Sequence, residues 1–185
     1  MESYLTSVKK QFEYYKSLAD KAILQVKDDE QLNWQPDANS NSIAIIIKHL
    51  VGNMRSRWTD FLTSDGEKSW RNREAEFEGS YESRAAMLVH WEQGCQCFLD
   101  AIESLTEADL KRIIYIRKEG HTVVEAINRQ LAHYPYHIGQ IVYLSRMLAG
   151  DHWRALSIPK GGSEAFNAER FAKEKQRKHF TDSLK

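Results

Sequence analysis

Two histidines four residues apart, His133 and His137, have the spacing that two metal ligands need on one helix. Because an α-helix turns once every 3.6 residues, both imidazoles would leave the same face one turn apart and could bind one ion. The spacing alone is weak evidence, since any helix with several histidines produces it by chance. Tyr134 follows the first histidine, so the segment is not the zincin His-Glu-x-x-His motif with its built-in general base.

A third histidine, His49, lies far upstream in the strongly helical stretch 45–53. On a helical wheel with about 100° per residue, it points roughly 120° from the centre of the apolar stripe that contains Ile46 and Leu50. We therefore expect it at or beyond the edge of the buried face, either exposed to solvent or facing a cavity as a ligand. Three neutral imidazoles from two helices would leave a zinc-type ion one open position, the arrangement that catalysis needs.

The composition indicates one globular domain, since 185 residues can bury a core without disulfide or metal staples. Lys plus Arg and Asp plus Glu both number 26, so no excess of positive charge argues for nucleic acid. The absence of net charge favours self-association, and we expect a homodimer. No apolar run approaches the roughly 20 residues that span a bilayer, and no signal peptide is recognisable, so we expect a cytoplasmic protein without a membrane partner.

The two cysteines, Cys95 and Cys97, are separated by one residue. On a helix they would be rotated about 200° from each other, which is poorly suited to a disulfide or a shared metal. We interpret them as ordinary free thiols in a reducing cytosol.

Apolar residues at three- and four-residue spacings predict four long helices. Their expected ranges are 5–26, from Ser40 or Ser42 to 61, 83–105, and from Thr122 or Val124 to 148. The polar stretch 64–79 predicts a long crossover connection, which could cover a site. Strand-like runs at 113–116 and 121–124 predict a hairpin with Gly120 in its turn.

Pro135 predicts a kink or irregular turn around the two histidines, and Gly150 predicts the end of that helix. A fifth helix is expected at 164–178. The fold class is all-α: an antiparallel four-helix bundle with one long crossover, a small β-hairpin before the last bundle helix and a C-terminal helical tail. One domain is expected over 1–185, with the bundle at about 1–150 and the extension at about 151–185.

The first helix, the Ile-Lys-His49-Leu stretch, the hairpin and His133-x-x-x-His137-Ile-Gly-Gln-Ile resemble the DinB/YfiT-like superfamily. The resemblance covers most of residues 1–150, and the tail at 157–166 is similar to one uncharacterised bacterial branch of that superfamily. Its members are four-helix bundles in which one histidine of helix two and two of the last bundle helix hold a metal. The resemblance therefore implies a metal site at His49, His133 and His137.

Histidine nitrogens suit zinc, nickel and iron, and zinc is the first choice because three histidines with an open position form a known catalytic arrangement. Such an ion would activate water or bind a thiolate from a small-molecule substrate. The resemblance implies both chemistries, a hydrolase or an S-transferase that uses a low-molecular-weight thiol such as bacillithiol or mycothiol. The alternative is a non-catalytic, metal-binding stress-response dimer in which the ion only ties helices together.

No general base or other catalytic residue can be assigned from the sequence. The polar residues near the ligands are Asn53, Tyr134, Tyr136 and Gln140, and none of them is a carboxylate. Asn53 lies one turn after His49, and Gln140 follows His137 by three positions, so either could reach the ion or hold an imidazole from behind. The lack of a nearby carboxylate weakens the hydrolase hypothesis and leaves room for thiol transfer, in which the metal itself activates the nucleophile.

Overall fold

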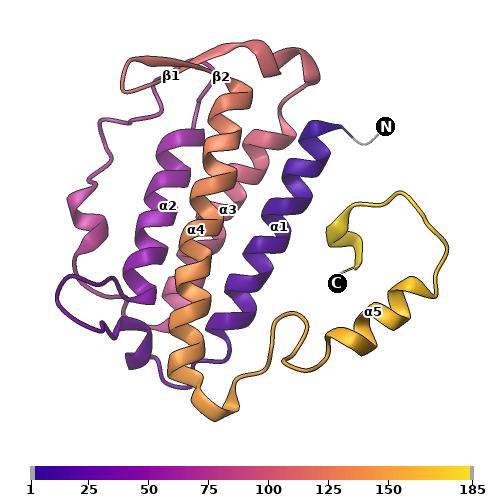
Figure 1. Ribbon diagram of the computed structural model, residues 1–185. Helices are drawn as coiled ribbons and strands as arrows, with labels where there is room; N and C mark the ends of the chain where they lie inside the picture. The colour runs from indigo at the N-terminus through magenta and orange to yellow at the C-terminus, as the bar shows by residue number, and fades with distance from the viewer. Residues whose placement is uncertain (1–2, 184–185) are drawn as a thin grey trace.

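The computed structural model describes residues 3–183 as a mostly helical protein with one small β-hairpin (Figure 1). Four long helices lie side by side: α1 (Tyr4–Ile23), α2 (Ile43–Trp58), α3 (Arg84–Glu103) and α4 (Val123–Ala149). α2 packs against α3 and α4, and α1 packs against α4 and α3. Shorter 3-10 helices occupy Glu30–Asn33, Glu74–Phe77, Glu107–Lys111, Gly150–His152 and Phe180–Ser183. Within the described range, no helix combines the length and the apolar character that crossing a membrane requires.

Each of the four long helices begins at a hydroxyl side chain that accepts a hydrogen bond from the first turn. The four capping residues are Ser3, Ser42, Ser83 and Thr122. A cap of this kind contributes about 1 kcal/mol, because it satisfies a backbone N–H that the helix itself leaves unpaired. Of the two serines considered at the start of α2, Ser42 is the cap, and it fixes where the helix that carries His49 begins.

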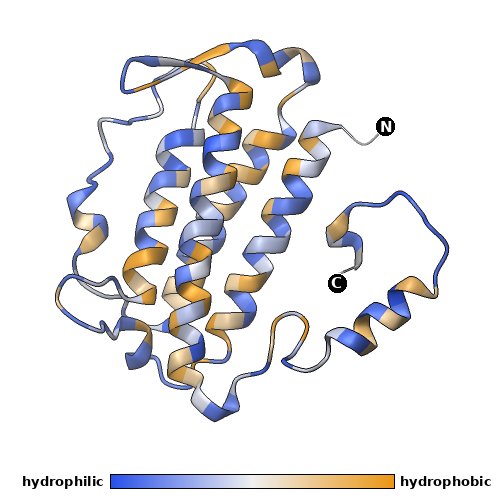
Figure 2. Ribbon diagram, in the orientation of Figure 1, coloured by the Kyte–Doolittle hydropathy of each residue, from blue (hydrophilic) through white to orange (hydrophobic). Residues whose placement is uncertain are grey.

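The core lies between the four long helices. Figure 2 shows apolar and polar residues interspersed along each of them, as expected for helices with one face buried. α2 and α3 approach closely at Gly94, where a Cβ atom would lie 3.0 Å from the Cα atom of Val51. This close contact packs α3 directly against the backbone of the helix that carries His49.

The hairpin forms before α4 as expected, but its turn has two residues instead of the four between the predicted strands, and the second strand begins two residues earlier. β1 (Ile113–Ile116) pairs antiparallel with β2 (Glu119–Thr122), and Gly120 lies within β2 opposite Tyr115. The turn residues are Arg117 and Lys118, with φ angles of 54° and 65°. The Asp65 carboxylate accepts hydrogen bonds from both of their backbone N–H groups, at 2.8 and 2.7 Å. This long-range contact stabilises left-handed backbone at two residues that are not glycine, so the prediction of Gly120 in the turn was wrong.

α4 runs through Pro135 as one continuous helix and ends at Gly150, whose φ is 53°. The expected irregular turn around the histidines is therefore not found, and both histidines lie on one uninterrupted helix. The helix of the tail, α5 (Ser163–Phe171), is shorter than predicted. None of its residues is buried, so no tertiary packing extends it. Beyond α5 the chain returns to α1, where Asp182 pairs with Lys10 at 3.0 Å.

Candidate metal site

The three histidines singled out by their spacing come together between α2 and α4. His49 lies on α2, and His133 and His137 lie on α4. One nitrogen atom from each lies within 4.8 Å of the others, and the Nε2 atoms of His49 and His133 are 3.4 Å apart. His49 is buried and the other two are half-buried. This group could hold a metal ion.

Each imidazole has an oxygen acceptor behind it, on the side away from the cluster. The pairs are His49 Nδ1 with Glu76 Oε2 at 3.0 Å, His133 Nδ1 with Gln130 Oε1 at 3.2 Å, and His137 Nδ1 with Gln140 Oε1 at 2.9 Å. Because an acceptor oxygen fixes the proton on Nδ1, each Nε2 atom is left with its lone pair. Two such lone pairs 3.4 Å apart repel each other unless a cation lies between them.

Glu76 corrects the expectation that no carboxylate lies near the ligands. It sits on the 3-10 helix of the crossover, and Arg71 donates to both of its oxygens, at 2.7 and 3.0 Å. The side chain of Arg71 is only 3% exposed. Burial by itself raises the pKa of Glu76, but the hydrogen bonds from His49 and Arg71 outweigh it and hold the pKa below its ordinary value. Glu76 is therefore an ionised carboxylate with both oxygens engaged.

Gly52 makes the space that the carboxylate of Glu76 occupies. A Cβ atom at position 52 would lie 2.2 Å from Glu76 Oε1, closer than any atoms can approach. Phe77, the next residue of the crossover, covers the His49 ring at a centroid distance of 5.2 Å. These contacts explain why His49, which the helical wheel places at the edge of the buried face, is only 7% exposed.

The two acceptors on α4 follow the helix period. Gln140 was among the residues expected near the site. It follows His137 by three positions, and its Oε1 atom accepts the hydrogen bond from His137 Nδ1. Gln130 was missed, although it precedes His133 by the same three positions and faces it. The spacing could have identified Gln130, whereas nothing local connects Glu76 to a histidine 27 positions away.

Tyr134 and Asn53 lie beside the cluster but form a separate hydrogen-bonded chain. The Tyr134 hydroxyl accepts from Trp58 Nε1 at 2.9 Å and donates to Asn53 Oδ1 at 3.3 Å. Tyr134 is fully buried, and burial raises the pKa of its hydroxyl. Both residues therefore join α2 to α4 next to the histidines without a hydrogen bond to an imidazole. Tyr136 is exposed, with its ring 4.9 Å from that of His137.

The surroundings keep the two histidines of α4 neutral, the form that binds metal. Burial, together with the neighbouring imidazoles of His137 and His49, lowers the pKa of His133 to about 4. Burial also lowers the pKa of His137, against the opposing effect of its hydrogen bond to Gln140. Near neutral pH both imidazoles are thus available as ligands without first losing a proton.

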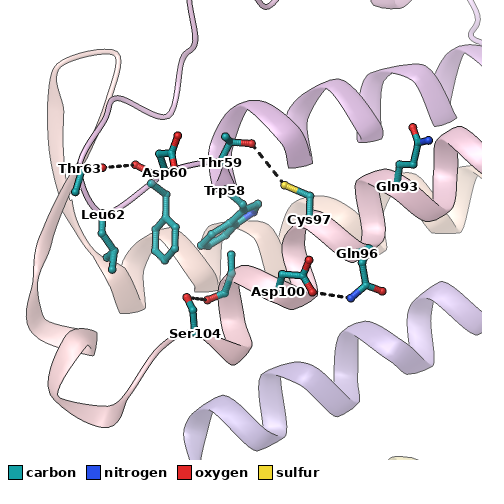
Figure 3. A pocket seen from close by; sticks show the side chains of 12 residues that line it. Trp58, Thr59, Asp60, Leu62, Thr63, Gln93, Gln96, Cys97, Asp100 and Ser104 are labelled. Carbon is teal, nitrogen blue, oxygen red and sulfur yellow. Dashed lines mark hydrogen bonds between the residues drawn. The ribbon is translucent and has the colours of Figure 1, made fainter.

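A pocket of about 680 Å³ lies away from the histidines, where the ends of α2 and α3 meet (Figure 3). Cys97 lines it, with Sγ 3.7 Å from the hydroxyl of Thr59. Burial raises the pKa of this thiol, so it is mainly protonated. Both Cys95 and Cys97 are free, as predicted. A second pocket, of about 540 Å³, is lined by Gln140 and therefore adjoins the cluster.

The fold and the site together define a mostly helical protein with a three-histidine cluster that could bind a metal ion. A family model with the description "Protein of unknown function (DUF1572)" matches residues 1–162, and the chain belongs to this family. The match includes all four long helices, the hairpin and the three histidines. No curated protein matches the chain.

Proposed function

We propose that the chain is a metal-dependent enzyme in which His49, His133 and His137 hold one divalent ion. The observation that carries this proposal is the set of three acceptor oxygens, which direct three Nε2 lone pairs to one place. An oxygen acceptor behind each metal-binding imidazole is a recurrent arrangement in metalloproteins, because it fixes the tautomer and raises the basicity of the ligand.

Zinc is the first choice, with nickel or iron as other ions that imidazole accepts. Zinc–nitrogen bonds of 2.0–2.1 Å in a tetrahedral site put two ligand nitrogens roughly 3.3–3.4 Å apart. The 3.4 Å between Nε2 of His49 and Nε2 of His133 fits this spacing. Three protein ligands leave a fourth position open, which supports a catalytic site rather than a closed structural one.

Two further proposals concern the fold and its setting. The packing of α2 on α3 and α4, and of α1 on α4 and α3, supports an antiparallel four-helix bundle of the DinB/YfiT-like kind. We place the protein in the cytoplasm as a homodimer that acts on a small-molecule substrate. The free cysteines and the balanced charge support this placement.

A divalent ion at this site would supply either a water of lowered pKa or a binding position for a substrate thiolate. Glu76 orients His49 and is a poor general base, because His49 and Arg71 occupy both of its oxygens and hold its pKa down. A thiol is more acidic than water, so hydrolysis gains more from a nearby base than the transfer of a low-molecular-weight thiol does. The engaged carboxylate of Glu76 therefore favours the S-transferase over the hydrolase.

The alternative is a non-catalytic stress-response dimer in which the ion is structural. The contact of His49 with Glu76 favours this hypothesis to some extent, because it joins α2, the crossover and α4 in one buried network. An ion in that network would hold the three segments together even if no substrate reached it.

The first experiment measures the metal content of the purified protein by elemental analysis. We expect close to one equivalent per chain in the wild type, and loss of the metal when His133 and His137 are both replaced by alanine. His152→Ala is the matched control, because His152 is exposed on the 3-10 helix that follows α4. Full metal content in the double variant would refute the site.

The second experiment separates the enzyme from the structural alternative. Turnover is measured with ester and amide substrates and with electrophiles in the presence of a low-molecular-weight thiol. Turnover that a chelator abolishes, with little change in the melting temperature, supports the enzyme. A large drop in melting temperature with chelator, and no turnover in any assay, supports the structural ion.

A further inference from the structure

The pocket beside the histidine cluster has a composition that points to a particular kind of ligand. It has a volume of about 540 Å³ and lies between the loop that leads into α2 and the outer face of α4. Asn39 and Asn41 line it from the loop, and Tyr136, Gly139 and Tyr143 line it from α4. Volumes of this order are typical of sites for small organic molecules.

The pocket adjoins the cluster through two residues of α4. Gln140 lines the pocket and also accepts the hydrogen bond from His137 Nδ1 at 2.9 Å. Tyr136 lines it as well, and its ring lies 4.9 Å from the His137 ring. A molecule seated here would therefore lie against the side chains that surround one of the three histidines.

The side chains that line the pocket are all uncharged. A charged ligand group would lose water here without gaining a counter-ion, which makes its binding unfavourable. Amide side chains, by contrast, supply both donors and acceptors. The oxygen of Gln140 is taken by His137, and among residues 3–183 its amide nitrogen has no partner, so it remains as a donor toward a ligand.

Two exposed tyrosines flank a gap in the surface of α4. Tyr136 and Tyr143 are 63% and 66% exposed, and Gly139 lies between them along the helix. A Cβ atom at Gly139 would meet nothing within 4 Å, so the space beside its backbone is open. Exposed aromatic rings of this kind present flat apolar faces together with a polar hydroxyl group.

We propose that this pocket binds the uncharged part of the substrate that reacts at the histidine cluster, a group with a flat face and amide functions. The proposal rests on the proposed function for the role of the pocket, but binding itself does not require the metal. The tyrosine rings contact the flat face, and the amide side chains pair with the amide groups of the ligand.

The test uses Gly139→Leu, because a Cβ atom at this position meets nothing within 4 Å and leucine adds bulk at the pocket together with a good helix former in α4. Ala132→Leu is the matched control, since Ala132 is exposed on the same helix and does not line the pocket. The probes, compared at about pH 6, are N-acetyl-tyrosinamide, which is uncharged, N-acetyl-tyrosine, an anion, and tyrosinamide, whose amino group is protonated at that pH. Binding is measured by calorimetry and ligand-detected NMR, and metal content is measured for every variant.

We expect the uncharged amide to bind the wild type and Ala132→Leu at least tenfold more tightly than it binds Gly139→Leu. The two charged probes should bind the wild type at least tenfold more weakly than the uncharged one. Equal binding to Gly139→Leu, equal binding of all three probes, or no binding of the uncharged probe to the wild type would overturn the proposal. The metal content distinguishes failure of this proposal from failure of the proposed function. Gly139→Leu should retain the ion. A wild type that holds no metal but still binds the uncharged amide would refute only the proposed function.

Discussion

The histidine cluster and the Cys97 pocket both contain side chains that can bind metal or react, but these side chains differ in their hydrogen-bond partners. In the cluster, every imidazole has a partner oxygen that turns its lone pair inward. In the pocket of Figure 3, the thiol of Cys97 has only weak contacts, to the hydroxyl of Thr59 and to a backbone oxygen, and burial raises its pKa. The pocket offers space for a ligand, whereas the cluster offers nitrogen lone pairs that are already oriented toward one point.

This difference shows what distinguishes an organised polar cluster from a packing residue in this chain. A buried polar group is costly unless a hydrogen bond compensates it. Around His49 the compensation extends outward from the imidazole to Glu76 and then to Arg71. Comparable support is not seen behind Cys97, so we interpret that thiol as a packing residue. Four substitutions test this difference between the histidine cluster and Cys97.

The largest effect is expected for Glu76→Gln. The change keeps the size of the side chain and one acceptor oxygen, but it removes the charge that faces Arg71 and His49. Substitution of the partner behind a metal ligand typically weakens metal binding about 10–100-fold, and we expect a decrease within that range because the neutral amide is a weaker acceptor than the carboxylate. Competition with a chromophoric chelator measures it.

Glu74→Gln is the control for this change, because Glu74 lies on the same 3-10 helix with its side chain 86% exposed. We expect it to leave metal affinity unchanged. If both variants bound metal like the wild type, the carboxylate behind His49 would have no role in the site.

The next effect in size is expected for Gly52→Ala. Alanine gains about 0.5–1 kcal/mol of helix propensity over glycine, but its Cβ atom collides with the Glu76 carboxylate. We expect a net loss of about 1–3 kcal/mol in the free energy of unfolding, in the range of overpacked sites, and weaker metal binding.

Gly139→Ala should change the free energy of unfolding in the opposite direction, toward greater stability. No neighbouring atom lies within 4 Å of its added Cβ, so only the gain in propensity remains, about 0.5–1 kcal/mol. Urea unfolding of both variants measures the pair. Equal stabilisation by the two alanines would show that Gly52 does not reserve space for Glu76.

An effect on stability of similar size, but none on metal binding, is expected for Tyr134→Phe. The change leaves Trp58 Nε1 and Asn53 Oδ1 without their hydroxyl partner, and an unsatisfied buried group costs about 1–3 kcal/mol. We expect lower stability by thermal or urea unfolding and unchanged metal content. Tyr143→Phe, at an exposed position of α4, should change stability by less than about 0.5 kcal/mol. Loss of metal in Tyr134→Phe would place this hydroxyl in the site after all.

The smallest effect is expected for Cys97→Ser. The thiol makes only long contacts, at 3.7 and 3.9 Å, so we expect a change in stability of about 1 kcal/mol or less and no change in metal content. In the wild type the raised pKa lowers the thiolate fraction near pH 8, and modification by a disulfide reagent should be slower than that of a free small-molecule thiol. Rapid modification, or loss of metal on substitution, would contradict the contrast between the two regions.

The sequence allowed prediction of those parts of the site that depend on short-range periodicity. The spacing of His133 and His137 and the position of Gln140 follow from the helix repeat. Glu76 could not be predicted in this way, because its position depends on how the crossover folds back over α2. The hairpin itself was predicted, but the position of its turn was not, because Asp65 stabilises a turn at Arg117 and Lys118 from more than fifty positions away.

The continuous course of α4 past Pro135 has a consequence for how the site assembles. Gln130, His133, His137 and Gln140 lie on this one helix, so two of the three histidines and their acceptors are in place as soon as α4 forms. The third histidine joins them only when the loop of 84 residues between His49 and His133 closes, which carries an entropic cost. A bound ion would act as a cross-link that holds this loop closed. Its removal would leave α4 intact, and the hydrogen bonds of Tyr134 to Trp58 and Asn53 would remain as the polar link between α4 and α2 beside the cluster.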